Sequence, residues 1–282
     1  MHDLDSAANA TKNREFYEHA YSQVDVDRLV AKLRDSRAFL SRARETGSFW
    51  GFYADGFEHL LAGKRIVELG SGNGLNALLM ASFGAEVLAI DISEHCEHST
   101  LQAADKLGLK NVTARTGDFV AMELEPASFD FVVGKHILHH LTHDIEAAFL
   151  EKTRAILKPA GIARFVEPAV NNHALDNLRW LVPVPGRPSI LARRAFAAWK
   201  ARDPHPVRDN SSAHYTEAGR RYFHEVKIRP FGSIDRLHRF LPRGGLNNSY
   251  RRWAHRIEPG LPDWFRSFAA RAQIIDFARP RH

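Results

Sequence analysis

The chain has 282 residues, of which 44% are hydrophobic and 26% are charged, as is ordinary for a globular protein in water. No apolar run approaches the ~18 residues that a membrane-spanning helix needs, and the acidic N-terminus lacks the apolar stretch of an export signal. The single Cys96 excludes an intrachain disulfide. We therefore expect a cytoplasmic protein.

The net charge of +6 conceals an asymmetry between the two parts of the chain. Residues 1–167 carry a net charge of −6, whereas residues 168–282 carry +12. This distribution suggests an anionic binding partner for the C-terminal part. A solvated, arginine-rich surface is the alternative.

Residues 1–62 are predicted to be helical, because apolar residues recur at steps of three and four over residues 14–21, 26–44 and 52–61. The β-branched run of residues 65–69 then turns through Gly70, Gly72 and Gly74 into a segment of helical composition. This pattern predicts a strand, a tight loop that approaches a ligand, and a helix N-terminus. The dinucleotide fingerprint G-x-G-x-x-G would require glycine at position 75, where this chain has Leu75.

Glu68 stands directly before the glycine loop, two residues from Gly70. Its carboxylate would repel a pyrophosphate but attract a ligand that carries an ammonium and a sulfonium group, as S-adenosylmethionine does. The acidic-x-G-x-G-x-G pattern of residues 68–74 resembles the first motif of class I S-adenosylmethionine-dependent methyltransferases. A glycine-rich turn that binds nothing is the alternative.

The second strand is predicted at residues 86–91 and ends in Asp91, which can accept both ribose hydroxyls or can cap the helix that follows. A third strand at residues 112–115 precedes a Gly-Asp pair. The resemblance implies that Asp118 receives the adenine amino group and that Phe119 packs against the ring.

The fourth strand, residues 129–134, leads into residues 135–141, which resemble the "vLHHL" element of small-molecule methyltransferases. If this segment is a helical turn, His136, His139, His140 and His143 lie on one face. The histidines could be metal ligands, structural rings bonded to the loop, or catalytic groups. We expect no metal, and His136 is the preferred general base because it is nearest to the strand end.

The fifth strand, residues 162–168, places Glu167 at the same crevice, where it could orient a histidine or bind the acceptor. A surface carboxylate is the alternative. The last two strands are predicted at residues 224–229 and 271–278, with about 40 residues between them where a hairpin would need two to five.

The predicted fold class is α/β, with a Rossmann-like, seven-stranded, mostly parallel sheet and helices on both faces. Residues 1–62 form a helical segment over the cofactor pocket, residues 63–168 form the core, and residues 169–223 form a cap insertion. Residues 224–282 supply the last two strands and a second cap insertion at about 231–270. In the resembled family an N-terminal aromatic often covers the methionine end, which makes Tyr21, Trp50 and Tyr53 candidates; core packing is their alternative.

The resemblance implies an S-adenosylmethionine-dependent methyltransferase of small-molecule biosynthesis. We find no Asn/Asp-Pro-Pro-Tyr/Phe motif after the fourth strand, no cysteine at a strand end and no spaced carboxylates for a divalent metal. These absences favour metal-independent O-methylation of a small or lipid-linked acceptor, and leave N- and C-methylation open. The charge asymmetry suggests that this acceptor is anionic. An RNA methyltransferase with a basic cap and a non-catalytic donor-binding protein are the alternatives. The oligomeric state stays open.

Two groups of site residues follow from these motifs. The expected donor-binding residues are Tyr21, Glu68, Gly70, Ser71, Gly72, Asn73, Gly74, Asp91, Ile92, Gly117, Asp118, Phe119 and Lys135. The expected catalytic residues are His136, His139, His140 and Glu167.

Overall fold

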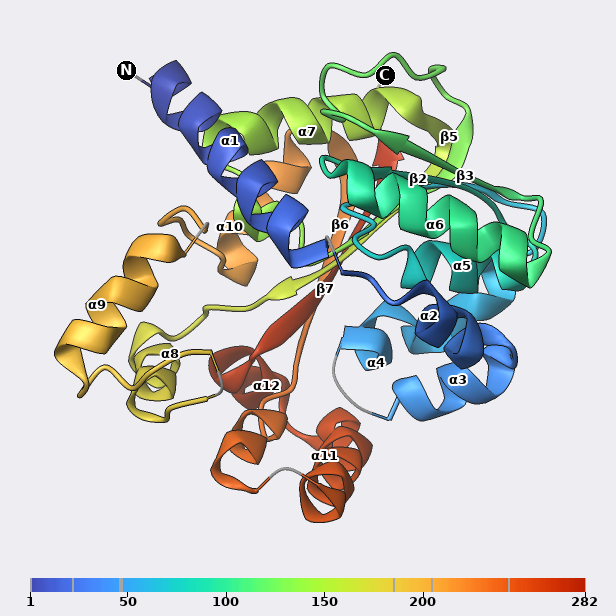
Figure 1. Ribbon diagram of the computed structural model, residues 1–282. Coiled ribbons are helices and arrows are strands. Elements are labelled where there is room, and N and C mark those ends of the chain that lie inside the picture. Colours follow the sequence, from blue (N-terminus) through green and yellow to red (C-terminus); the bar gives the residue numbers. More distant parts are fainter. Residues whose placement is uncertain are drawn as a thin grey trace.

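A seven-stranded sheet runs through the centre of the computed structural model, which describes residues 2–21, 23–45, 48–184, 186–203, 205–242 and 244–281 (Figure 1). The strand order is β3-β2-β1-β4-β5-β7-β6, and only β7 runs antiparallel to its neighbours. The predicted fold class is therefore confirmed. The strands are β1 (Arg65–Leu69), β2 (Glu86–Asp91), β3 (Val112–Thr116), β4 (Phe129–Lys135), β5 (Leu157–Pro168), β6 (Phe223–Phe231) and β7 (Ala272–Pro280).

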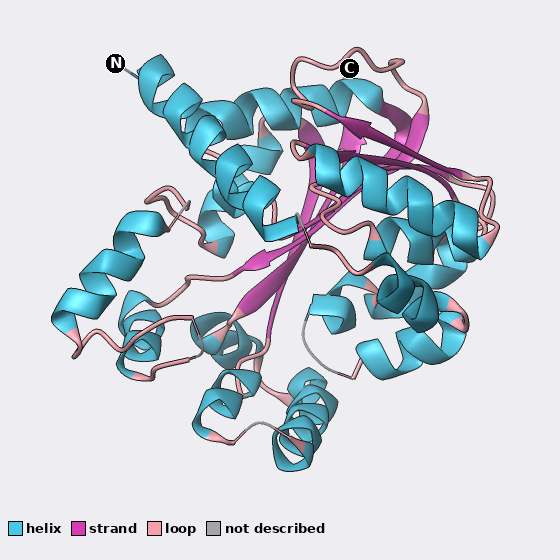
Figure 2. Cartoon of the chain, viewed as in Figure 1, coloured by secondary structure: helices cyan, strands magenta, loops and turns pink. Residues whose placement is uncertain are grey.

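Helices cover both faces of this sheet (Figure 2). The continuous apolar runs of β1 and β4 suit central parallel strands, because such strands are buried on both sides. One face packs against α2 (Val26–Leu33), α3 (Ser36–Ala43), α4 (Ser48–Phe52), η1 (Ala54–Leu60), α5 (Leu75–Ser82) and α6 (Glu94–Leu107). The other face packs against α7 (His143–Ile156) and α10 (Ser212–Arg220).

Two local predictions differ from the structure. The single helix expected over residues 26–44 is divided into α2 and α3, because the Asp35 side chain accepts a hydrogen bond from the backbone N–H of Ala38 and starts a new helix. Strand β5 begins at Leu157 instead of at residue 162. Leu157 already pairs with Phe129, and an irregularity at residues 158–161 lies within the strand.

The two insertions contribute short helices around the lower ends of β5, β6 and β7 (Figure 1). Residues 169–223 contain α8 (His173–Leu178), η3 (Arg179–Leu181), α9 (Arg193–Arg202) and α10. Residues 231–270 contain η4 (Asp235–Phe240), α11 (Gly245–Ile257), η5 (Glu258–Gly260) and α12 (Asp263–Ala269). Helix α10 packs on β6 and β7 and so belongs to the layer that covers the sheet, which differs from its expected place in the cap.

The remaining helix, α1 (His2–Tyr21), lies across the carboxyl ends of the central strands (Figure 1). Within the part of the chain that the structure describes, no helix combines the length and the apolar character needed to cross a membrane.

Candidate functional site

The glycine loop between β1 and α5 requires its glycines. Gly70, Gly72 and Gly74 have φ values of 65°, 56° and 74°, in the left-handed region that favours glycine. A Cβ on Gly70 would lie 2.8 Å from Cδ1 of Ile137, and one on Gly72 would lie 2.8 Å from the hydroxyl oxygen of Tyr21. The loop backbone thus lies directly against the side chains of Ile137 and Tyr21, which leave no room for a side chain at Gly70 or Gly72.

A cavity of about 800 Å³ opens between this loop, the carboxyl ends of β2, β3 and β4, and helix α1; we call it the donor cavity. It collects almost all the residues singled out from the sequence. Those on its wall are Tyr21, Glu68, Gly70, Ser71, Gly72, Asn73, Asp91, Ile92, Gly117, Asp118, Phe119, Lys135, His136, His139 and His140. Gly74 and Glu167 do not line it.

Glu68 is 2% exposed and ends β1 at the floor of the donor cavity. Its Oε1 accepts a hydrogen bond of 2.7 Å from the Asn76 side chain, whose own oxygen accepts one of 2.8 Å from the Tyr53 hydroxyl. Its Oε2 is buried and has no hydrogen-bond partner among the described residues. Burial therefore raises the pKa of Glu68 to about 7.

Asp91 is held at the end of β2 by two backbone donors. Its Oδ2 accepts a hydrogen bond of 2.8 Å from Gly72 N–H, and its Oδ1 accepts one of 3.1 Å from Ser93 N–H. Helix α6 starts at Glu94 with Ser93 as its N-cap, so Asp91 is not the cap itself. The carboxylate is locked in orientation while part of it faces the cavity.

The end of β3 supplies another acid and an aromatic ring. Oδ1 of Asp118 accepts a hydrogen bond of 2.9 Å from Val120 N–H, and the side chain is otherwise exposed at the cavity. Phe119 is buried and packs edge-to-face on Phe149, with 4.8 Å between ring centroids.

Of the three candidate covering aromatics, only Tyr21 reaches the cavity. Tyr53 is fully buried behind Glu68, and Trp50 stacks on His255 with 5.0 Å between ring centroids. Trp50 and Tyr53 therefore pack in the core, which was the alternative to covering the cofactor. Tyr21 also stacks on Tyr17 at 5.7 Å, so two aromatics from α1 form one wall.

The histidines do not share a helical face, contrary to the helical-turn prediction. His136 has φ 60° and its backbone N–H bonds the Val166 carbonyl at 2.9 Å, so the chain turns sharply before the 3-10 turn η2 (Leu138–His140) begins. His143 instead begins α7 and stacks on His214 at 4.6 Å. His136, His139 and His140 nevertheless all line the donor cavity.

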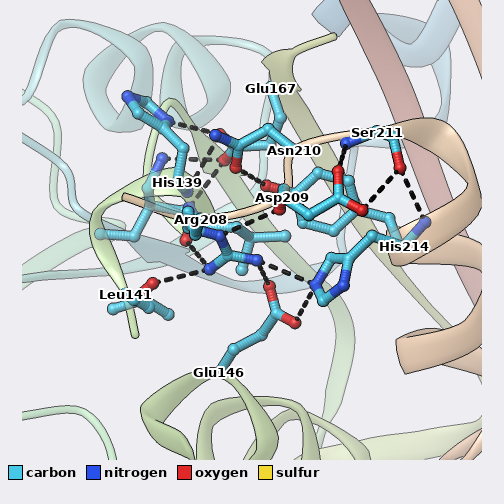
Figure 3. Close-up of polar contacts among 12 residues, drawn as sticks. His139, Leu141, Glu146, Glu167, Arg208, Asp209, Asn210, Ser211 and His214 are labelled. Atoms are coloured by element: carbon cyan, nitrogen blue, oxygen red, sulfur yellow. Dashed lines mark hydrogen bonds and ion pairs between the residues drawn. The ribbon is translucent and has the colours of Figure 1, made fainter. Parts of the chain in front are cut away.

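Glu167 is fully buried behind this turn and shapes it (Figure 3). Its Oε1 accepts hydrogen bonds of 2.9 and 2.8 Å from the N–H groups of Ile137 and Leu138. Its Oε2 lies 2.6 Å from Nδ1 of His139. Both oxygens are thus occupied, which agrees with the role of orienting a histidine and leaves no oxygen for an acceptor.

His140 is fixed by two residues of α1 that the sequence reading did not select. Its Nδ1 lies 3.1 Å from Oδ1 of Asn13, and its Nε2 lies 3.2 Å from the Tyr17 hydroxyl. A neutral ring satisfies both contacts by donating to Asn13 and accepting from Tyr17. Helix α1 is therefore tied to the histidine turn.

Arg208 is a second residue that was not predicted (Figure 3). Its side chain is 2% exposed and donates hydrogen bonds of 2.8 and 2.7 Å to the carbonyls of Leu138 and Leu141. It also pairs with Glu146, which accepts a further bond of 2.7 Å from His214. No local sequence pattern marks it, because the two carbonyls and the carboxylate that it binds lie more than 60 positions away.

Burial leaves the cavity histidines neutral. It lowers the pKa of His136 to about 4, and with repulsion from His205 and Arg208 it holds the pKa of His139 well below its ordinary value. Lys135 lies over the Phe49 ring at 4.2 Å, and burial also lowers its pKa. Among the described residues, the His136 ring has no hydrogen-bond partner.

Comparison with known proteins identifies the family. A family model described as a methyltransferase domain matches residues 66–161, which include the glycine loop, Asp91 and the histidine turn. Residues 66–161 form a methyltransferase domain with the class I fold. The match ends within β5, so the insertions lie outside it.

Curated relatives of this chain include the ubiquinone biosynthesis O-methyltransferase of Paraburkholderia phymatum, 33% identical over 39% of this chain and 46% of that protein. The protein-L-isoaspartate O-methyltransferase 1 of Anaeromyxobacter sp. is 37% identical over 49% of this chain and 53% of that protein. The chain therefore spans about half the length of the curated relatives it matches.

Two solved structures share the fold of this chain. Phosphoethanolamine N-methyltransferase 2 of Haemonchus contortus superposes with a TM-score of 0.52 at 16% identity, over 78% of this chain and 50% of that chain. Geranyl diphosphate C-methyltransferase of Streptomyces coelicolor gives a TM-score of 0.50 at 12% identity, over 78% of this chain and 71% of that chain. At these identities the likeness concerns the fold alone.

The donor cavity fits S-adenosylmethionine. The buried Oε2 of Glu68 lacks a hydrogen-bond donor, and the ammonium group of the cofactor would supply one. The glycine loop has no space for side chains on its inner surface, so its backbone can approach a ligand closely. The residues present therefore match the charge and the shape of this cofactor.

Two groups of described residues could hold a metal ion, His139 with His140 and His205, and His136 with His139 and Glu167. In the first group both ring nitrogens of His140 are engaged by Asn13 and Tyr17. In the second, Nδ1 of His139 and Oε2 of Glu167 bond each other. The expectation of no bound metal stays a prediction.

Proposed function

We propose that this methyltransferase transfers the methyl group of S-adenosylmethionine to an oxygen atom of a small or lipid-linked, anionic acceptor, without a metal ion. The observation that carries the proposal is that the His136 ring, which has no hydrogen-bond partner among the described residues, lines the same cavity as the donor loop. The O-methyltransferases among the curated relatives support oxygen as the accepting atom.

In this proposal each strand end binds one part of the donor. Glu68 receives the ammonium group, and Asp91 accepts hydrogen bonds from the ribose hydroxyls because Gly72 and Ser93 already fix its orientation. Asp118 accepts from the adenine amino group, beside Phe119. Tyr21 covers the loop, with its hydroxyl close above Gly72.

The chain accelerates the reaction mainly by positioning. The cofactor supplies a methyl group that is already activated on a sulfonium, so what remains is to align the acceptor oxygen with the carbon–sulfur bond. Such alignment can contribute about 7–11 kcal/mol, whereas a general base typically contributes ~10²–10⁴-fold in rate. An O–C bond forms while the C–S bond breaks, and the sulfur keeps the electron pair.

His136 takes the proton that the acceptor oxygen loses. Its lowered pKa of about 4 leaves it neutral at pH 7, so a ring nitrogen is available as an acceptor. An oxygen that has just been alkylated is strongly acidic, so even this weak base can remove its proton. His139, through Glu167, and His140, through Asn13 and Tyr17, act as positioning residues for the turn.

Calorimetric titration with S-adenosylhomocysteine tests the donor site. We expect Asp91→Ala to weaken binding about 10- to 100-fold, since hydrogen bonds to a charged group are lost. His136→Asn is the matched control and should keep the affinity, because asparagine tolerates the left-handed backbone at this position. Once an acceptor is found, H136N should lower turnover.

Three outcomes would overturn the proposal. One is binding of NAD or ATP in place of S-adenosylhomocysteine, and another is an unchanged affinity in D91A. The third is full turnover in H136N, which would remove the proposed base.

A further inference from the structure

A second cavity, of about 380 Å³, adjoins the donor cavity and shares His136 with it. Its walls come from α8, η4, the end of β6 and the start of β7, so both insertions contribute to it. We call it the arginine cavity. Its charged lining residues are Asp176, Arg179, Asp235, Arg236, Arg239 and Arg271.

Both carboxylates of the arginine cavity are already paired. Asp176 forms an ion pair of 3.0 Å with Arg179. Asp235, which is 2% exposed, forms ion pairs of 2.8 Å with Arg251 and 2.5 Å with Arg271. Neither carboxylate is therefore available to Arg236 and Arg239, the other two arginines that line the cavity.

Arg236 and Arg239 carry the excess positive charge. Arg236 donates one hydrogen bond of 2.6 Å to the Ala270 carbonyl, while its Nε is buried without a partner among the described residues. Arg239 makes no hydrogen bond or ion pair within the same described part of the chain. Burial and repulsion from Arg271 lower the pKa of Arg239 to about 10, so it stays charged at pH 7.

Such an arrangement is unfavourable until an anion enters. Guanidinium groups that are half-buried among like charges lose hydration and gain no carboxylate in return. A carboxylate or phosphate would satisfy the unused N–H groups with charge-assisted hydrogen bonds. Apolar side chains, including Leu178, Phe231 and Phe240, complete the lining and suit an apolar portion next to the charge.

Resting on the proposed function, we propose that the arginine cavity binds the anionic group of the acceptor, a carboxylate or a phosphate, through Arg236 and Arg239. An acceptor anchored there would extend past His136 into the donor cavity, because that residue lines both. The substrate class is then a small molecule with a nucleophilic oxygen at one end, an apolar body and an anionic group at the other end.

Fluorine NMR titrations of the full chain saturated with S-adenosylhomocysteine test this assignment. The probes are 4-fluorophenyl phosphate and 4-fluorobenzoate, with 4-fluorobenzyl alcohol as the neutral analogue. We expect at least one anionic probe to bind 10-fold or more tighter than the alcohol. Arg239→Gln should weaken that probe about 10-fold or more and leave the alcohol unchanged, and Arg239→Glu should abolish its binding.

Arg239 has no internal partner among the described residues, so its variants should fold, and their unchanged S-adenosylhomocysteine affinity confirms that they do. Arg220→Gln, at an exposed arginine that lines neither cavity, is the matched control and should bind the probes like the wild type.

The inference fails if both anionic probes bind no tighter than the alcohol, or if they bind R239Q and R239E as tightly as the wild type. If S-adenosylhomocysteine binds the wild type while the probes give either of these two results, only the assignment of the arginine cavity fails. If S-adenosylhomocysteine itself does not bind, the proposed function fails.

Discussion

Two residues of the donor cavity depart from what stability alone would favour. His136 adopts φ 60°, which is uncommon for a residue other than glycine, and Glu68 buries a carboxylate oxygen with no partner among the described residues. Strain and unsatisfied polar groups persist where the surroundings enforce them, and they concentrate at functional sites. Here the strained backbone at His136 places its side chain at both cavities. The buried oxygen of Glu68 can accept a hydrogen bond from a cationic group.

The pKa of Glu68 makes donor binding dependent on pH. Its carboxyl is ionised above a pKa of about 7, and only the ionised form attracts an ammonium group. The affinity for S-adenosylhomocysteine should therefore be highest above pH 7 and fall up to tenfold per pH unit as the pH drops below it. Calorimetry between pH 5.5 and 8 measures this slope.

Glu68→Gln should remove that slope and bind weakly at every pH. Glu123→Gln, at an exposed position outside both cavities, should keep the wild-type profile. A wild-type affinity that does not change across the range would contradict the assignment of Glu68 to the ammonium group.

At the level of elements, the histidine turn is held from two directions. Glu167 at the end of β5 binds its N–H groups, and Arg208 from the segment between α9 and α10 binds its carbonyls (Figure 3). The turn has too few residues to fix its own conformation. Its shape therefore depends on a buried arginine that is contributed by an insertion.

Replacing Arg208 by alanine should destabilise the fold strongly. The change leaves Glu146, which is 3% exposed, with only His214 as a partner, and breaking a buried pair typically costs ~3–5 kcal/mol. Arg221→Ala is the control, because Arg221 forms an exposed ion pair with Glu217 that is worth about 1 kcal/mol or less. Urea unfolding followed by circular dichroism compares them, and equal midpoints would show that Arg208 is not required.

At the scale of the whole molecule, some arginines of the basic C-terminal part turn inward. Arg208 and Arg251 form buried or half-buried ion pairs, and Arg236 and Arg239 line a cavity. The net charge of +12 on residues 168–282 therefore does not translate directly into a basic outer face.

Six histidines whose pKa values the fold lowers should make it sensitive to acid. Burial lowers the pKa values of His136, His139, His140, His143, His238 and His255. Between about pH 4 and 6.5 these histidines are protonated in the unfolded chain but stay neutral in the folded chain. Their contribution to the free energy of unfolding is therefore fully present above pH 6.5 and decreases as the pH is lowered. Glu68, Asp91 and Glu167, whose pKa values burial raises, act in the opposite direction but are fewer.

Urea unfolding at a series of pH values measures this effect. Near pH 5.5 unfolding should take up on the order of two to four protons, each worth about 1.4 kcal/mol per pH unit. His140→Gln should lower the slope by about one proton, since neutral His140 is held between Asn13 and Tyr17. Stability that is constant between pH 5 and 7 would contradict this account.

Local patterns sufficed wherever a residue's role depends on its own strand or loop. The glycine spacing, the acid before it and the acid at the end of β2 are set by strand periodicity and backbone conformation, and the structure places all three at one cavity. The helical face predicted for the histidines was wrong because a contact with β5 overrides local propensity. Asn13, Tyr17 and Arg208 gave no local signal, because each acts on a partner far along the chain.

The sequence by itself determined the sheet, its seven strands and the donor loop, since alternating apolar strands and helices with short connections permit few arrangements. Only the tertiary structure decided the acceptor side. The arginine cavity draws its walls from α8, η4, β6 and β7, which are separated by up to about a hundred residues. No periodicity spans such intervals, so packing alone brings those charges together.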